Sequence, residues 1–312
     1  MTSVVRIATR GSKLALWQAE HVSALLRGRE PGLTVELVVL KTRGDKILDR
    51  ALSEVGGKGL FVKEIEEALL DGRADVAVHS MKDLTSEVPD ELTIAAVPER
   101  EDPRDALLVR PGLEARTVAA LPSGARVGTS SLRRVCQLRA RHGDLAIEPL
   151  RGNVDTRLGK LERGELDAIV LACAGLRRLG FGDRITAALS TEESLPAIGQ
   201  GALAIECRKD DAATAARLAA LDDPATHRAV AAERGFLARL EGDCKTPLAA
   251  FATLDKNSQR LSLEGLIGAP DGSRIVRATV EGPAADGPAL GRALAERLLA
   301  DGGGALLASH KS

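Results

Sequence analysis

One of the four cysteines, Cys244, stands where a thiolate could react. It lies in Glu241-Gly-Asp-Cys-Lys-Thr-Pro247, a predicted turn between a helix and a strand, and Arg239 and Lys245 are close enough in sequence to favour the thiolate. The other three cysteines fall in predicted helices or strands, where thiols usually act as small buried hydrophobes: Cys136, Cys173 and Cys207. The spacing therefore permits a covalent role for Cys244 without establishing one.

A carboxylate follows an apolar strand in the stretch His79-Ser-Met-Lys-Asp83. Asp83, beside Lys82 at the end of a strand and facing a cationic cleft, could accept or return protons and stabilise a developing positive charge. A lone Asp-Lys pair is more often a surface ion pair, so this cluster needs support from others.

Two further polar clusters stand where a predicted strand runs into a predicted helix. Thr9-Arg10-Gly11-Ser12 could bind an anion or could simply cap the helix, with Arg10 in solvent. In Gly128-Thr-Ser-Ser-Leu-Arg-Arg134, Ser130 or Ser131 is expected to cap the helix. Two arginines in its first turn oppose the helix dipole, and a bound anion would relieve that cost.

More arginines follow the next two predicted strands, at Arg151, Arg157 and Arg178. The planar guanidinium group binds carboxylates with two parallel hydrogen bonds. Such an array fits a ligand that carries several carboxylates along its length, although some of these arginines are expected to be plain surface residues.

Several classes of function are disfavoured. The formal net charge is -1 and aromatic residues make up 2%, which argues against binding of nucleic acid. Gly56-Gly-Lys-Gly-Leu-Phe61 does not have the residue order of a phosphate-binding loop, and the histidines form no metal-binding motif. No stretch is apolar enough for a signal peptide or a membrane span, so we expect a cytoplasmic protein that contacts no membrane and holds no metal.

The elements that must position these residues alternate between short strands and helices from residue 4 onward. This rhythm predicts α/β lobes with mostly parallel sheets, a boundary in the polar stretch Pro98–Pro103, and a small α+β region at the end of the chain. We expect a first lobe of residues 1–98 plus about 202–220, where residues 202–207 return to the first sheet. A second lobe covers 99–201 and a third domain covers 221–312.

Together these motifs resemble the porphobilinogen deaminase family from Arg6 to the end of the chain, less strongly after about Thr253. Beyond the clusters above, the resemblance rests on four further stretches: Thr42–Asp45, Glu101–Asp105, Leu150–Asn153 and Leu195–Gly201. It implies two lobes like those of periplasmic binding proteins, and a third domain that carries a cofactor cysteine. It also implies a transferase, hydroxymethylbilane synthase, that joins four porphobilinogen molecules head to tail with loss of ammonia in tetrapyrrole (porphyrin, haem) biosynthesis.

The resemblance also assigns roles to residues. Cys244 would hold a dipyrromethane cofactor through a thioether, and Asp83, with Lys82, would be catalytic. Further cofactor contacts would come from Ser80, Thr129, Ser131, Arg133, Arg134 and Gly152. Substrate would be bound by Arg10, Ser12, Arg134, Arg151, Arg157, Arg178 and Gln200, while Lys58 and Phe61 would lie in a lid loop over the cleft. A monomer is expected from the resemblance alone.

Two departures from the family pattern are small. Asp243 replaces a common glycine before the cysteine and could raise the pKa of the Cys244 thiol slightly, while Leu84-Thr85 replaces Val-Pro after Asp83. Two rivals remain from the residues themselves. A two-lobed protein could bind a polycarboxylate without reacting, and a phosphoryl-transfer enzyme could use the arginine-rich helix starts.

Overall fold

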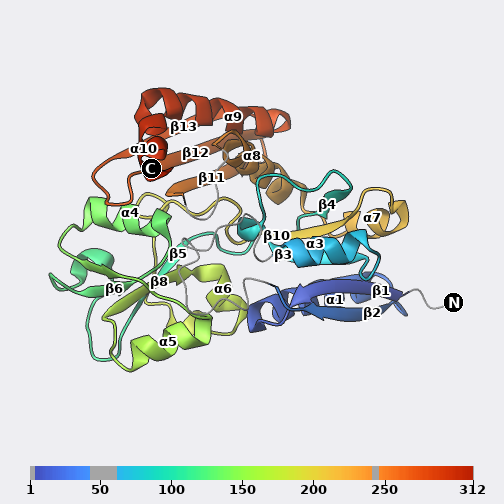
Figure 1. The fold of residues 1–312 in the computed structure, drawn as a ribbon, viewed down its shortest axis with the longest axis horizontal. Helices are drawn as coiled ribbons and strands as arrows, with labels where there is room; N and C mark the ends of the chain where they lie inside the picture. Colours follow the sequence, from blue (N-terminus) through green and yellow to red (C-terminus); the bar gives the residue numbers. More distant parts are fainter. Residues whose placement is uncertain (1–3, 43–61, 241–245, 312) are drawn as a thin grey trace. The chain divides into compact units, whose positions relative to one another are not determined.

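The computed structural model describes residues 4–42, 62–240 and 246–311 (Figure 1). The chain forms two compact units. Unit 1 comprises Met1–Glu101 and Ala202–His227, and unit 2 comprises Asp102–Gly201 and Arg228–Ser312. The division into three domains remains a prediction. Among the described helices, none is both long and apolar enough to cross a membrane.

Unit 1 is built on a five-stranded sheet in the order β2-β1-β3-β10-β4. Its strands are β1 (Val4–Arg10), β2 (Thr34–Leu40), β3 (Val76–Ser80), β4 (Leu92–Ala96) and β10 (Leu203–Arg208). β1 runs parallel to β2 and β3, whereas β10 is antiparallel to β3 and β4. The predicted return of residues 202–207 to the first sheet is therefore confirmed.

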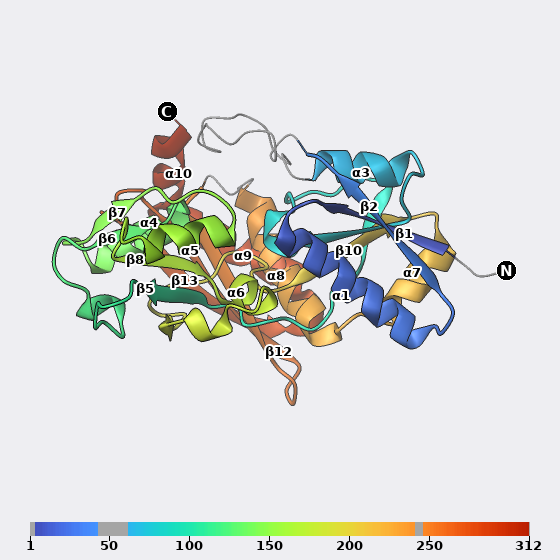
Figure 2. The same cartoon turned by 90° about the horizontal axis from the view of Figure 1, so that it is seen from below.

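Helices cover both faces of this sheet because β3 is apolar on both sides (Figures 1 and 2). Val76 and Val78 share a core with α1 (Lys13–Arg29), to which α7 (Ala212–Ala219) also contributes. Ala77 shares a separate core with α3 (Lys63–Leu70). Successive strand residues point to opposite faces, so α1 and α3 lie on opposite faces of the sheet.

Unit 2 contains a second five-stranded sheet, in the order β7-β6-β8-β5-β9. The strands are β5 (Asp105–Val109), β6 (Arg126–Gly128), β7 (Ala146–Glu148), β8 (Ala168–Ala172) and β9 (Ala187–Ala188). β6 is parallel to β7 and β8, and β5 is antiparallel to β8 and β9. Three helices follow strands of this sheet: α4 (Leu132–Arg141), α5 (Val154–Glu162) and α6 (Cys173–Arg178).

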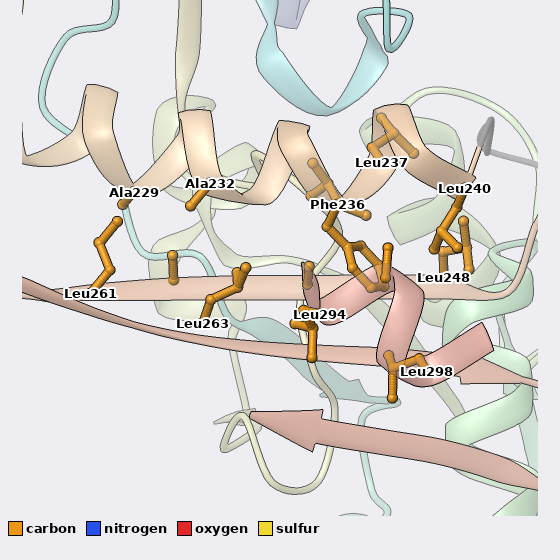
Figure 3. Packing of buried hydrophobic residues seen from close by; sticks show 14 of the residues in the cluster. Ala229, Ala232, Phe236, Leu237, Leu240, Leu248, Leu261, Leu263, Leu294 and Leu298 are labelled. Atoms are coloured by element: carbon orange, nitrogen blue, oxygen red, sulfur yellow. The ribbon is translucent and has the colours of Figure 1, made fainter. Parts of the chain in front are cut away.

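The rest of unit 2 is an antiparallel sheet of β11 (Leu248–Asp255), β12 (Arg260–Gly268) and β13 (Ile275–Pro283). It packs with α8 (Pro224–Leu240) and α9 (Gly287–Leu298) around a core in which Phe236 and Leu294 are fully buried. Figure 3 shows these side chains of α8 and α9 meeting those of β12. A Cβ at Gly265 of β12 would lie 2.8 Å from Leu294, so this position must stay without a side chain.

The glycines at 302–304 are expected from the sequence to stop a helix. Gly302, within the turn Leu299–Gly303, has a φ of 107° and breaks the helical backbone, and a separate helix, α10 (Gly304–Lys311), follows. One expectation was wrong. Cys173 begins α6 instead of lying inside a strand. Short 3-10 turns, which the sequence pattern did not indicate, occupy Met81–Asp83 (η1), Val118–Ala120 (η2), Gly182–Arg184 (η3) and Ala284–Asp286 (η4).

Candidate active site

Two of the predicted clusters meet in one pocket of unit 1. β1 and β3 are parallel neighbours, paired at Ile7 with Val76, so the residues after both strands lie at the same edge of the sheet. The pocket is lined by Arg10, Ser12, Leu14, Ala15, Gln18, Val62, Ile65, Val78, His79, Ser80 and Asp83. A guanidinium, two hydroxyls and a carboxylate thus face one space.

The hydroxyls in this pocket are held by α1. Ser12 is the N-cap of α1, as predicted, and its Oγ accepts a hydrogen bond from the backbone N–H of Ala15 at 3.3 Å. Gln18, one turn further along, donates from Nε2 to Ser80 Oγ at 2.7 Å. The start of α1 therefore fixes the geometry of both hydroxyls.

Asp83 ends the turn η1, which β3 and β10 hold in place. The backbone N–H of Met81 donates to the carbonyl of Ala202 at 3.0 Å, and the N–H of Leu84 donates back to the carbonyl of Met81. Asp83 is solvent-exposed while it lines the pocket, and Lys82 is half-buried beside it. An exposed carboxylate on an anchored turn can meet a ligand without moving the backbone.

In unit 2, the two arginines of the α4 start bind one buried carboxylate. Arg133 Nη1 and Arg134 Nη2 each lie 2.7 Å from an oxygen of Asp105, which is completely buried at the start of β5. Ser194 Oγ donates to Asp105 at 2.7 Å and Gln200 Nε2 at 2.9 Å. Four side chains therefore bind this one carboxylate in a single network: Arg133, Arg134, Ser194 and Gln200.

Electrostatics makes Asp105 a permanent anion. Burial alone would raise the pKa of its carboxyl, but the charges of Arg133 and Arg134 outweigh burial and hold the pKa well below its usual range. The cationic helix start was expected to need a bound anion, and the structure shows that the protein supplies one itself. No local pattern in the sequence indicates this partnership, because Asp105 lies 28 residues before Arg133.

The serines before α4 act differently from the expectation. Ser131 is the N-cap residue of α4, but its side chain makes no capping hydrogen bond. Its backbone N–H donates to Thr129 Oγ1 at 3.3 Å. Ser130 Oγ instead donates to the carbonyl of Leu150 and accepts from its N–H, both at 2.9 Å. Ser130 therefore links the loop after β6 to the loop after β7. Neither serine caps the N-terminus of α4 with its side chain.

The loop before α5 positions Arg157. Asn153 caps α5 by accepting from the Thr156 N–H at 3.0 Å, and Arg157 Nε donates to the carbonyl of Gly152 at 2.7 Å. Burial, together with the charges of Arg134 and Arg151, lowers the pKa of Arg157 to about 10. Three guanidinium groups therefore repel one another here, and carboxylates of a ligand would relieve that repulsion.

The other two predicted substrate contacts are Arg178, at the end of α6, and Gln200, in the segment before β10. Arg178 Nη2 donates to the carbonyl of Gly201 at 2.7 Å, and Gln200 also donates to the carbonyl of Pro103. Gln200 is fully buried, so its amide nitrogen serves the Asp105 network.

Four residues singled out in the sequence lie outside the described residues: Lys58, Phe61, Asp243 and Cys244. The remaining cysteines, Cys136, Cys173 and Cys207, are buried as predicted, and burial raises the pKa of each thiol to about 11. They are therefore poor nucleophiles. Within the described ranges, no three His, Cys, Asp or Glu side chains come close enough to hold a metal ion.

Comparison with known proteins decides the family. Residues 5–216 match the model described as "Porphobilinogen deaminase, dipyromethane cofactor binding domain", and residues 227–300 match "Porphobilinogen deaminase, C-terminal domain". The chain belongs to the porphobilinogen deaminase family. The porphobilinogen deaminase of Chromobacterium violaceum is 54% identical over 97% of this chain and 96% of its own length. That of Bordetella parapertussis is 56% identical over 97% and 95%.

Among solved structures, the matches to this chain include two periplasmic proteins. The VFT2 domain of BvgS from Bordetella pertussis is 18% identical, with a TM-score of 0.41 over 69% of this chain and 85% of that domain. The aliphatic sulphonate binding protein SsuA of Escherichia coli is 16% identical, with a TM-score of 0.42 over 76% and 70%.

The family, the transferase activity of a porphobilinogen deaminase and the dipyrromethane-binding character of the chain are thus confirmed. The predicted fold class is confirmed by the two mixed α/β sheets and the antiparallel C-terminal sheet with its helices. The roles of individual residues stay predictions.

Proposed function

We propose that this chain joins four porphobilinogen molecules head to tail, releases one ammonia at each addition, and frees hydroxymethylbilane by hydrolysis. The observation that carries this proposal is the pocket in unit 1, where Arg10, Ser12, Ser80 and Asp83 face one space. Such a pocket offers a cation for a carboxylate arm of the substrate and a carboxylate for its positively charged reacting centre.

Asp83 is the proposed catalytic group, with Lys82 beside it. Loss of ammonia leaves a positive charge on the substrate, and a carboxylate stabilises such a charge as it develops. Asp83 also accepts hydrogen bonds from pyrrole N–H groups and supports protonation of the leaving amine. Because Asp83 stands on an anchored turn, it keeps its position while successive substrates enter.

The side chains of unit 2 fit the dipyrromethane group. This group carries acetate and propionate carboxylates, and the mutual repulsion of Arg134, Arg151 and Arg157 marks a place where anions are stabilised. Thr129, Ser131, Arg133 and Gly152 are further proposed contacts, together with Ser80, Lys82 and Asp83 of unit 1. Bound to Cys244 through a thioether, dipyrromethane supplies the pyrrole carbon to which the first substrate is joined.

The remaining predicted residues are assigned to substrate. We assign Arg10, Arg151, Arg157 and Arg178 to the carboxylate arms of the pyrroles, and Ser12 and Gln200 to supporting hydrogen bonds. Lys58 and Phe61 are proposed to belong to a lid. We propose that the protein works as a monomer in the cytoplasm. Size-exclusion chromatography with light scattering tests whether it is a monomer.

Intact-mass spectrometry with a turnover assay tests the proposal. The purified protein is expected to exceed its sequence mass by two linked pyrrole units, and Cys244→Ser is expected to lose both the excess and turnover. Cys207→Ala is the matched control, because this buried thiol should leave the excess unchanged. Asp83→Ala should keep its fold and nearly lose turnover. A protein that binds polycarboxylates without reacting would show neither a mass excess nor release of ammonia.

A further inference from the structure

A buried pair of titratable side chains lies beside the Asp83 pocket, and the proposed function does not use it. His79 Nε2 and Glu206 Oε2 are 3.1 Å apart, and the two residues are 5% and 0% exposed. The register pairs His79 with Ala204 and Glu206 with Ala77. His79 and Glu206 are therefore diagonal neighbours on one face of the sheet, within reach of each other's side chains.

That face is the one covered by α3, because Ala77 shares a core with α3. Glu66 of α3 is half-buried there, and its Oε1 and the Oε1 of Glu206 have no hydrogen-bond partner among the described residues. Burial and, to a lesser extent, the negative charge of Glu206 raise the pKa of Glu66 to about 7, against an opposing effect of His79. Glu66, His79 and Glu206 therefore interact electrostatically within one buried cluster.

Other charges on the elements packed against α3 are already engaged. These elements are β1, β3 and β10. On β1, Arg6 binds Asp75, and Arg10 lines the pocket. On β10, Arg208 also binds Asp75. The same arginine donates to the backbone carbonyls of Leu69 and Ala74. Within the described ranges, the charges that act on Glu66 are those of Glu206 and His79.

The network adjoins the pocket directly. His79 lines the pocket together with Asp83, and so does Ile65, the residue before Glu66. We propose that Glu66, His79 and Glu206 form one buried proton-holding network that sets the charge facing Asp83, with Glu206 as the positioning residue for the His79 ring. This inference rests on the proposed function, because the charge of the network is proposed to act on the cation that the substrate forms when it loses ammonia.

The sign of the effect follows from the charges. When Glu66 loses its proton as the pH rises, the network gains one negative charge beside the pocket. A negative charge stabilises the substrate cation, so turnover rises as the pH passes through the Glu66 titration. Glutamine at position 66 mimics the protonated acid and holds turnover at its low-pH level.

The first test compares kcat and KM across pH in the cofactor-loaded enzyme. Glu66→Gln should match wild type at about pH 6 and fall about fivefold below it at about pH 8.5, with little change in KM because Glu66 does not touch substrate. Glu206→Gln should lower kcat about tenfold. Glu67→Gln, the adjacent helix residue whose side chain is 51% exposed and pairs with Lys63, is the matched control and should keep the wild-type profile.

The second test does not depend on turnover. In wild type, the imidazole nitrogen resonances of His79 should report the loss of the Glu66 proton as a step in their pH dependence, and this step should vanish in Glu66→Gln. An unchanged step in that variant, or wild-type pH profiles of kcat, would overturn the network while leaving the proposed function intact. If circular dichroism shows that Glu206→Gln does not fold, the Glu66→Gln variant and the His79 resonances decide alone. Absent turnover and absent mass excess in wild type would instead refute the proposed function.

Discussion

Asp105 accepts hydrogen bonds from Arg134 at 3.0 Å from Nε and 2.7 Å from Nη2, and both side chains are almost completely buried. The third guanidinium nitrogen, Nη1, donates to the carbonyl of Val170 at 3.1 Å. Every nitrogen of the group therefore has a protein partner, which fixes its plane. Such a preset orientation spares a ligand the cost of ordering this side chain.

Asp105→Asn should destabilise unit 2 strongly. The substitution leaves two buried guanidinium groups without their counter-ion, and breaking a buried ion pair from one side costs about 3 to 5 kcal/mol. The measurement is the free energy of unfolding from urea titration. Asp71→Asn, which breaks the exposed ion pair with Arg73, is the control and should leave the midpoint unchanged. Equal midpoints for Asp105→Asn and wild type would contradict the structural role of this carboxylate.

Removing the Arg157 side chain should stabilise the protein and weaken substrate binding. Burial and the charges of Arg134 and Arg151 disfavour its cation, so Arg157→Met should raise the free energy of unfolding by about 1 kcal/mol in the protein free of substrate. The same variant should raise KM for porphobilinogen, because a carboxylate loses its partner. Urea titration and steady-state kinetics measure the two effects. Arg163→Met, which removes an exposed cation from the end of the same helix, should change neither quantity.

The elements that local signals specify could be predicted from the sequence. Ser12, placed before the apolar pattern of α1, indicated the helix start. The sequence pattern also predicts strands over 105–109 and 126–128 and a helix over 132–141, which are the bounds of β5, β6 and α4. The pocket followed from the same logic, since Arg10 ends β1 and Asp83 lies in the turn after β3, and these strands proved to be parallel neighbours.

What could not be predicted depends on partners far apart in the chain. Nothing local to Asp105 shows that it binds Arg133 and Arg134, and nothing near Ser130 shows that it prefers Leu150 to a helix cap. Glu206 could have drawn notice as a charged residue inside the apolar run of β10, which is rarely tolerated without a partner. The short α6 and the edge strand β4 have too few residues for a clear period.

Gly152→Ala should strain the backbone beside Arg157 and so displace this arginine from Arg134 and Arg151. Gly152 has a φ of 106°, and an added Cβ would lie 2.8 Å from the Thr156 side chain. We expect a loss of about 2 kcal/mol in the free energy of unfolding. A rise in KM should accompany it, because the Gly152 carbonyl holds Arg157. Gly164→Ala is the matched control: its φ is 71°, it has no atom within 4 Å of the added Cβ, and it should lose less stability with an unchanged KM.

Glu66 should make stability fall as the pH rises. Its pKa is raised from 4.5 to about 7 in the folded chain, chiefly by burial, so the folded state holds a proton that the unfolded state releases. The stabilisation is complete below about pH 4.5 and is lost as the pH rises through about 7, which costs roughly 2 kcal/mol. Urea titrations at several pH values should show this decline in wild type and in Glu67→Gln. A decline of the same size in Glu66→Gln would mean that another group causes it.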